Sequence, residues 1–162
     1  MRGHNLVELI EKYSWAEVMI LLLRGDLPTK NEAKFLENIL VAASENGIEA
    51  PSLYAPRISV ASGNSFNTAL AAGILAVGTK HGGAGEACAE LLASSKTPQE
   101  IVAENKIIPG FGHKIYKNAD PRATALYAAA KKFKLSCKYF DKAYAIEKEL
   151  EKTKSKKLPI NI

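Results

Sequence analysis

The chain has 162 residues, 47% of them hydrophobic and 24% charged, so its composition excludes a disordered protein and suits one globular domain with a real core. The longest apolar runs, such as VMILLL at residues 18–23, are far too short to cross a membrane. Twenty-two basic and 17 acidic side chains leave a net charge of +5, which suits an anionic small molecule or a nucleic acid without selecting either.

Apolar residues recur at three- and four-residue steps along the first half of the chain, which predicts helices. A first helical segment spans residues 6–24, and a second begins after Thr29, a plausible N-cap. A shorter helix is expected after Pro56, because prolines interrupt the residues before it. The segment 65–78 is rich in small residues and apolar around most of its circumference, which is typical of a helix buried on many sides.

The second half continues the helical pattern. Further helices are predicted over residues 85–95, 97–105, 121–134 and 136–157. No convincing β-alternation extends beyond four residues. The chain is therefore predicted to be all-α, with eight helices and no internal repeat.

One stretch between two predicted helices is not helical in pattern. This segment, IIPGFGHKIYKNADPRATAL, covers residues 107–126. Within it, Asp120 followed by Pro121 predicts an N-cap and the first position of a helix. Arg122 would then project from the first helical turn, where a planar guanidinium can bind a carboxylate with two hydrogen bonds. An ordinary surface arginine is the alternative interpretation.

The earlier part of the same segment concentrates glycine, histidine and lysine. Gly110 and Gly112 precede His113 and allow a sharp turn or a close approach to a flat ligand. Lys114 and Lys117 follow within four residues and suit phosphate groups. A glycine-rich turn with a solvated basic rim would have the same composition, so this motif alone does not establish a site.

A second histidine lies in a similar setting. The segment KHGGAGEACAELL, residues 80–92, places His81 and two glycines just ahead of a predicted helix. The positive potential of a helix N-terminus disfavours an imidazolium, so a neutral His81 is expected to donate a hydrogen bond to a developing enolate oxygen. A histidine that caps a buried helix is the alternative. Two histidines in glycine-rich loops at helix edges favour a functional site.

Together these blocks resemble the citrate synthase superfamily. HGGAGEA is similar to the family's HGGA-N/G-E block, and PGFGHKIYKNADPRA to its PGFGH-basic-x-Y-K-x-x-DPRA block. RGHNLVELIEKYSWAEVMILLLRGDLPTKNE resembles the RGYD-to-GELPT segment, and PRISVASGN the AARVIASTG helix. HGGAGEACAELL and the ending SKKLPINI look most like stand-alone citryl-CoA lyases and the citrate-cleaving module of ATP-citrate lyase.

The resemblance implies a citrate-synthase-like helical fold, truncated at the C-terminus. Large-domain-type helices would lie in residues 1–78, and the CoA and dicarboxylate site in residues 79–156. His81 would stabilise the enol or enolate of acetyl-CoA. His113 would bind the oxaloacetate carbonyl in condensation, or take the proton of the citryl hydroxyl in cleavage. Arg122 would clamp a carboxylate of oxaloacetate or citrate.

The resemblance also implies that a coenzyme A thioester is the substrate, with no covalently bound cofactor and no metal site. The residues that would embrace the CoA adenine or lie near its phosphates are Pro109, Gly110, Phe111, Gly112, Lys117 and Lys156. A homodimer is expected from the habit of the family. A nucleic-acid partner is not expected, since the lysines near the C-terminus accompany no recognition motif.

Two departures from the family pattern bear on function. Asn46 stands where members commonly have the histidine of a DHG motif, and an amide cannot become a cation, so carboxylate affinity should fall. The family aspartate that moves the proton of the acetyl group follows P-N-V/I-D, whereas LPINI ends at Ile162, one residue short. Asp120 is an unsuitable substitute base because of its cap role, and Glu86 is a weak candidate.

Two functional hypotheses therefore stay open. The first is an enzyme that cleaves citryl-CoA to acetyl-CoA and oxaloacetate, or catalyses the reverse condensation. The second is a catalytically inactive relic that binds CoA or a tricarboxylate, or a regulatory partner of a complete paralogue. A cytoplasmic location is expected, because no signal peptide opens the chain and Cys88 and Cys137 suit unpaired, half-buried thiols.

Overall fold

The computed structural model describes residues 1–45, 47–154 and 157–161. Within these ranges the chain forms nine helices and three isolated β-bridges but no strand, so the all-α prediction is confirmed. The helices are α1 (Leu6–Lys12), α2 (Trp15–Arg24), α3 (Lys30–Ala43), α4 (Pro51–Ala61), α5 (Phe66–Leu75), α6 (Ala84–Ala93), α7 (Pro98–Glu104), α8 (Pro121–Lys132) and α9 (Lys138–Lys154). None of these helices combines the length and the apolar character that crossing a membrane requires.

The first predicted helix is in fact two helices, so the prediction of eight was wrong by one. The backbone is extended at Tyr13 and Ser14, which end α1 and begin α2. The Ser14 hydroxyl accepts the backbone N–H of Glu17, and the Glu17 carboxylate accepts the backbone N–H of Ser14. This capping box satisfies two N–H groups that a continuous helix would have paired internally, and it therefore starts a new helix.

The prediction of a shorter helix after Pro56 was also wrong, because α4 begins at Pro51 and contains Pro56. Pro56 has no N–H for the carbonyl of Ser52, the usual partner four residues earlier. Its ring instead packs against Gly73 of α5. A β-carbon at Gly73 would lie 2.9 Å from the ring and 2.8 Å from the Ser52 carbonyl oxygen. The glycine therefore lets α4 and α5 pack closely at the point where α4 lacks a hydrogen bond.

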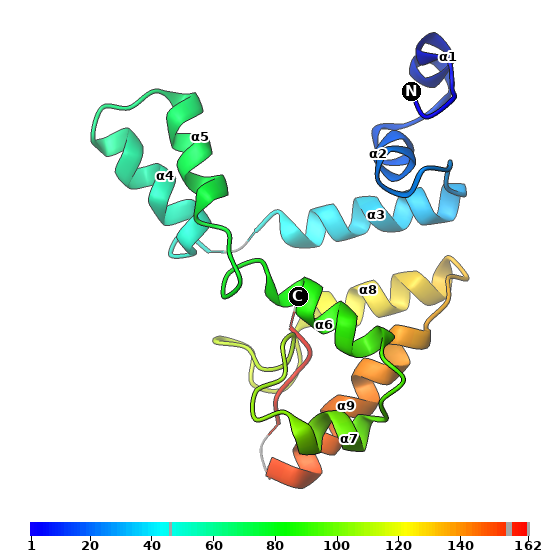
Figure 1. The fold of residues 1–162 in the computed structure, drawn as a ribbon, viewed down its shortest axis with the longest axis vertical. Coiled ribbons are helices and arrows are strands. Elements are labelled where there is room, and N and C mark those ends of the chain that lie inside the picture. Colours follow the sequence, from blue (N-terminus) through cyan, green and yellow to red (C-terminus); the bar gives the residue numbers. More distant parts are fainter. Residues whose placement is uncertain (46, 155–156, 162) are drawn as a thin grey trace.

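The apolar core of the molecule is formed by residues of the second half of the chain. Helices α6 and α7 pack against α9, and α3 packs against α8 (Figure 1). The core residues there are Ile101, Val102, Ile108, Ile146 and Leu150. Helices α1 and α2 lie at the far end of α3, and the α4–α5 hairpin projects away from the other helices (Figure 1). The division into residues 1–78 and 79–156 stays a prediction.

Helix α5 is not buried on many sides, contrary to the expectation for residues 65–78. Its buried residues are Ala69 and Gly73, and Gly73 faces α4, while Phe66 is 80% exposed and Leu75 84% exposed. The described chain offers α5 one packed neighbour, α4, so the remaining apolar faces contact solvent. The whole chain has an accessible surface of 10895 Å², whereas a compact monomer of this mass exposes about 7,900 Å².

Candidate active site

A tight turn before α6 presents His81. The backbone N–H of His81 donates to the Gly78 carbonyl at 2.9 Å, and the N–H of Gly78 donates to the His81 carbonyl at 2.7 Å. Helix α6 then starts at Ala84, so His81 lies just ahead of a helix N-terminus, as predicted. The paired backbone bonds of the turn fix the direction in which the imidazole leaves the chain.

The His81 ring is held by Ser52, the second residue of α4. The Ser52 hydroxyl lies 2.8 Å from Nε2 of His81, and the backbone N–H of Ser52 donates to the same nitrogen at 3.4 Å. Since a backbone N–H only donates, Nε2 acts as the acceptor and the proton of a neutral ring lies on Nδ1. The Nδ1–H of His81 is thereby available to a ligand oxygen.

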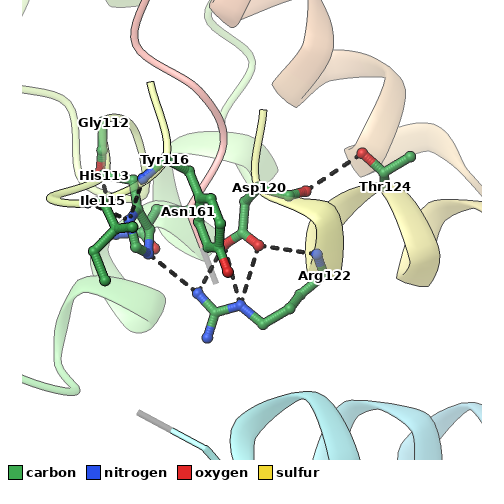
Figure 2. A network of polar contacts seen from close by, with 8 residues as sticks. All are labelled: Gly112, His113, Ile115, Tyr116, Asp120, Arg122, Thr124 and Asn161. Carbon is green, nitrogen blue, oxygen red and sulfur yellow. Dashed lines mark hydrogen bonds and ion pairs between the residues drawn. The ribbon is translucent and has the colours of Figure 1, made fainter. Parts of the chain in front are cut away.

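His113 is held in the opposite tautomer. Its Nδ1 accepts the backbone N–H groups of Ile115 at 3.0 Å and Tyr116 at 3.1 Å. With Nδ1 acting as the acceptor, a neutral imidazole carries its proton on Nε2. Figure 2 shows Nε2 turned toward the guanidinium of Arg122, 3.3 Å from its Nη2. Because both nitrogens carry protons, this pair attracts an acceptor oxygen placed against them.

Arg122 is anchored by Asp120, as Figure 2 shows. Asp120 is the N-cap of α8, and its carboxylate accepts the backbone N–H of Arg122 at 2.9 Å and the guanidinium Nη2 at 2.7 Å. Burial acts to raise the pKa of Asp120, but the hydrogen bonds from Arg122 outweigh it and the pKa is lowered overall. The hydrogen bond to Asp120 raises the pKa of Arg122. Asp120 is therefore a fixed counter-ion, and its two oxygens are already occupied.

The loop between α7 and α8 is held against the end of the chain. The N–H of Gly112 donates to the Pro159 carbonyl at 2.8 Å, and the N–H of Asn161 donates to the Gly110 carbonyl at 2.8 Å. Phe111 and Ile160 form an antiparallel bridge between these bonds. The predicted CoA-binding residues 109–112 thus form an ordered edge that leads directly to His113.

The structure brings some of the predicted site residues together and not others. His113 and Arg122 are in contact, whereas His81 pairs with Ser52, and no contact between the two histidines is present in the described ranges. The ammonium group of Lys117 donates to the Lys114 carbonyl at 2.7 Å, within its own loop. The predicted residues Asn46 and Lys156 lie outside the described residues.

Sequence reasoning missed three positions at this site. Ser52 is 29 residues from His81, and Asn161 is 49 residues from Gly112, to whose carbonyl its side chain donates at 3.2 Å. No local pattern could have found either contact. Asp120 was predicted as a cap, and the neighbouring Arg122 was the available sign that it would also be an ion-pair partner. The site as a whole therefore consists of imidazole and guanidinium groups of an all-α protein, and these groups can donate hydrogen bonds to a carbonyl or a carboxylate.

Comparison with known proteins identifies the family. The family described as "Citrate synthase, C-terminal domain" matches residues 28–162. Citrate synthase 2 of Bacillus subtilis (strain 168) is 30% identical over 173 residues, which cover 99% of this chain and 45% of that protein. The chain belongs to the citrate synthase family, and the resemblance noted from its motifs is confirmed.

Solved structures agree with this assignment. Citryl-CoA lyase from Hydrogenobacter thermophilus superposes with a TM-score of 0.90 at 36% identity, over 99% of this chain and 66% of that chain. A variant of Methanosaeta concilii ATP citrate lyase in complex with (3S)-citryl-CoA gives a TM-score of 0.88 at 25% identity, over 98% of this chain and 27% of that chain. The chain spans less than half the length of the curated relatives that it matches.

Proposed function

We propose that this chain carries citrate synthase or citryl-CoA lyase chemistry on a coenzyme A thioester. The observation that carries the proposal is the donor pair of His113 Nε2–H and Arg122 Nη2, 3.3 Å apart, in a chain of the citrate synthase family. An oxo acid has a carbonyl oxygen for the imidazole and a carboxylate for the guanidinium. The citryl-CoA bound to the Methanosaeta relative supports the same ligand class.

The tautomers determine which ring nitrogen of each histidine can donate a hydrogen bond to the substrate. His81 Nδ1–H would donate to the thioester oxygen and stabilise the enolate of acetyl-CoA. His113 Nε2–H would polarise the oxo-acid carbonyl and stabilise the developing alkoxide. Two backbone N–H groups occupy His113 Nδ1, so this ring acts most readily as a donor. His113 would therefore donate to the same oxygen in both directions, to the oxo-acid carbonyl in condensation and to the citryl hydroxyl oxygen in cleavage.

For the nucleotide end of CoA, the proposal places the ligand along the loop of residues 109–112. The ordered backbone of that loop supports this placement, because glycines allow a flat ring to approach closely. The exposed ammonium of Lys117 would exchange its bonds to loop carbonyls for bonds to a phosphate. Lys156 and Asn46 keep their proposed roles toward phosphate and carboxylate.

Binding without turnover is the second candidate function. The observation that favours it is Asp120, the carboxylate in contact with Arg122, whose oxygens are committed to that arginine. Within the described residues no other carboxylate contacts His113 or Arg122. A regulatory or relic protein would retain CoA affinity without acting on it.

The test uses the purified chain with citryl-CoA, and a reporter dehydrogenase follows oxaloacetate. We expect release of oxaloacetate that His81→Ala or His113→Ala lowers by about 100-fold or more. The third histidine, His4, provides the matched control His4→Ala, which should keep wild-type turnover. Binding of CoA measured by calorimetry without any turnover would support the second candidate, and absence of both would contradict the proposal.

We also propose that the chain forms a homodimer through the α4–α5 hairpin. A groove of about 760 Å³ runs along this hairpin, lined mainly by apolar side chains that include Val60, Phe66, Leu70 and Ile74. The chain exposes about 3,000 Å² more surface than a compact monomer of its mass, which is more than the roughly 1,000–2,500 Å² that each partner of an obligate dimer buries. The unpaired thiols of Cys88 and Cys137 support the proposed cytoplasmic location.

A further inference from the structure

The loop of residues 109–112, which precedes His113, contains two glycines and is therefore intrinsically flexible. Gly110 has a φ of +83° and Gly112 a φ of +93°, and glycine loses more backbone freedom on ordering than any other residue. Such a loop takes a single conformation only where outside contacts hold it. Within the described residues, the backbone hydrogen bonds that reach Gly110 and Gly112 from another segment come from residues 159–161.

Asn161 holds this loop on both sides of Phe111. Its backbone N–H donates to the Gly110 carbonyl at 2.8 Å, and its side-chain Nδ2 donates to the Gly112 carbonyl at 3.2 Å. Figure 2 shows Asn161 beside Gly112 and the His113 ring. The N–H of Gly112 is bonded in turn to the Pro159 carbonyl at 2.8 Å. Both polar backbone groups of Gly112 are therefore fixed by the last residues of the described chain.

The Gly112 carbonyl belongs to the peptide plane that joins Gly112 to His113. Because a peptide unit is rigid and planar, holding this carbonyl fixes the orientation of the His113 backbone nitrogen and Cα. The ring position then follows from the two N–H bonds of Ile115 and Tyr116 to Nδ1. Rotation of the plane would change the 3.3 Å separation between His113 Nε2 and Arg122 Nη2.

Cys88 of α6 packs against the loop at Gly110. A β-carbon at Gly110 would lie 2.6 Å from the Cys88 sulfur, so α6 already fills the space beneath this residue. The loop thus cannot move toward α6, and the hydrogen bonds of Asn161 oppose its movement away. A loop confined in this way transmits a change at Asn161 to His113.

We propose that Asn161 is a positioning residue for His113, acting through the Gly112 carbonyl. This inference rests on the proposed function for the meaning of the His113 position, since His113 is the group that would face the substrate carbonyl. The side-chain amide of Asn161 sets the orientation of the imidazole and leaves the identity of its tautomer to Ile115 and Tyr116.

The test compares Asn161→Ala and Asn161→Asp, which lack the side-chain N–H donor, with Asn161→Gln, which keeps an amide. The exposed Asn118 provides the control Asn118→Ala. The readouts are the ¹⁵N resonances of the His113 imidazole and the hydrogen exchange of the Ile115 and Tyr116 amides. Loss of one hydrogen bond should accelerate exchange of these two amides about 3- to 10-fold and shift the imidazole resonances. The glutamine and control variants should stay near wild type.

A second measurement separates positioning from general stability. The backbone bonds of Asn161 remain in each variant, so core amides such as Ile101 should exchange at wild-type rates. In the turnover assay, Asn161→Ala should lower kcat, and Asn161→Gln should restore kcat.

The outcomes separate this inference from the proposed function. Unchanged imidazole resonances and amide exchange in Asn161→Ala would overturn the positioning role, whatever the activity. Altered resonances and exchange in a protein that neither binds CoA nor turns over citryl-CoA would uphold the positioning role and reject the proposed function.

Discussion

Two independent constraints require glycine at position 110. One is its backbone conformation, and the other is its close packing against α6. Its φ of +83° is in the left-handed region, and a β-carbon there would lie 2.6 Å from the Cys88 sulfur. Burial raises the pKa of the Cys88 thiol, so the group remains protonated and packs as a small apolar side chain. The absence of a side chain at Gly110 leaves room for the Cys88 sulfur, and this contact determines how near the proposed CoA-binding loop lies to α6.

The first prediction follows from this contact. Gly110→Ala should reduce the free energy of unfolding, measured with urea, by about 1–3 kcal/mol more than Gly63→Ala does. Gly63 is the control because its φ is +86° and a β-carbon there would meet nothing within 4 Å. Both variants share the backbone strain, and the difference reports the clash with Cys88.

A double substitution checks the cause. In a Cys88→Ala background the nearest contact of the new β-carbon is removed, so the effect of Gly110→Ala should become smaller. Equal losses in the two backgrounds would mean that contact with Cys88 does not explain the destabilisation.

At the scale of the element, helix starts are the most regular feature of this chain. Helices α2, α3 and α7 each begin with a capping box, in which the cap is Ser14, Thr29 or Thr97. The glutamates that complete the boxes are Glu17, Glu32 and Glu100. Each carboxylate accepts hydrogen bonds at the positive end of a helix, where a negative charge is stabilised. The pKa of each of the three is lowered.

The second prediction is a loss of stability in acid. The backbone N–H of Thr29, followed by Arg24, lowers the pKa of Glu32 from 4.5 to about 2. A folded pKa below the unfolded one means that the contribution is present above pH 4.5 and lost as the pH falls toward 2. Glu32→Gln should therefore flatten the dependence of the unfolding free energy on pH within this window.

Glu11, an exposed residue of α1, supplies the matched control Glu11→Gln. The Glu11→Gln variant should show the same dependence of the unfolding free energy on pH as the wild-type protein, measured by urea unfolding above pH 4.5 and near pH 2. A Glu32→Gln variant whose stability falls as steeply as that of the wild type would show that this capping box does not carry the acid sensitivity.

At the scale of the whole molecule, the helices are well packed in one half and open in the other. Helices α6, α7 and α9 enclose the apolar core, while the α4–α5 hairpin, which projects away from the other helices (Figure 1), exposes large apolar side chains. Exposed apolar faces of this size on a folded protein mark interaction surfaces. The excess of accessible surface over a compact monomer is larger than the area that one subunit loses in an obligate interface, so it leaves ample surface for an intersubunit contact.

The third prediction concerns this surface. Light scattering of the purified chain should give a mass of about twice 17.5 kDa, and Ile74→Glu should weaken the dimer at least about tenfold, because it replaces a buried apolar contact by a charge. Ile10→Glu on α1 is the control, since Ile10 is 73% exposed and lies outside the hairpin groove. A monomeric wild type, or equal effects of the two substitutions, would contradict dimerisation through α4 and α5.

Much of the fold could be predicted residue by residue from the sequence. The caps at Thr29 and Asp120 were recognised because a capping bond joins residues two or three positions apart. The capping box at Ser14 carries the same signal, and the apolar periodicity across residues 6–24 concealed it. The family and the two histidine loops were also predictable, since each motif is a contiguous run of residues.

The contacts that make the loops into a site were not predictable in this way. The bond of Ser52 to His81, the bond of Asn161 to Gly112 and the packing of Cys88 under Gly110 join residues far apart in the chain. Local patterns reflect interactions within a few residues along the backbone, whereas these contacts depend on how whole helices pack. The sequence by itself determined most of the helices, the caps at Thr29 and Asp120 and the family, because these depend on residues close together in the chain. The tertiary structure alone decided the break between α1 and α2, the tautomers of the two histidines and the exposure of α5.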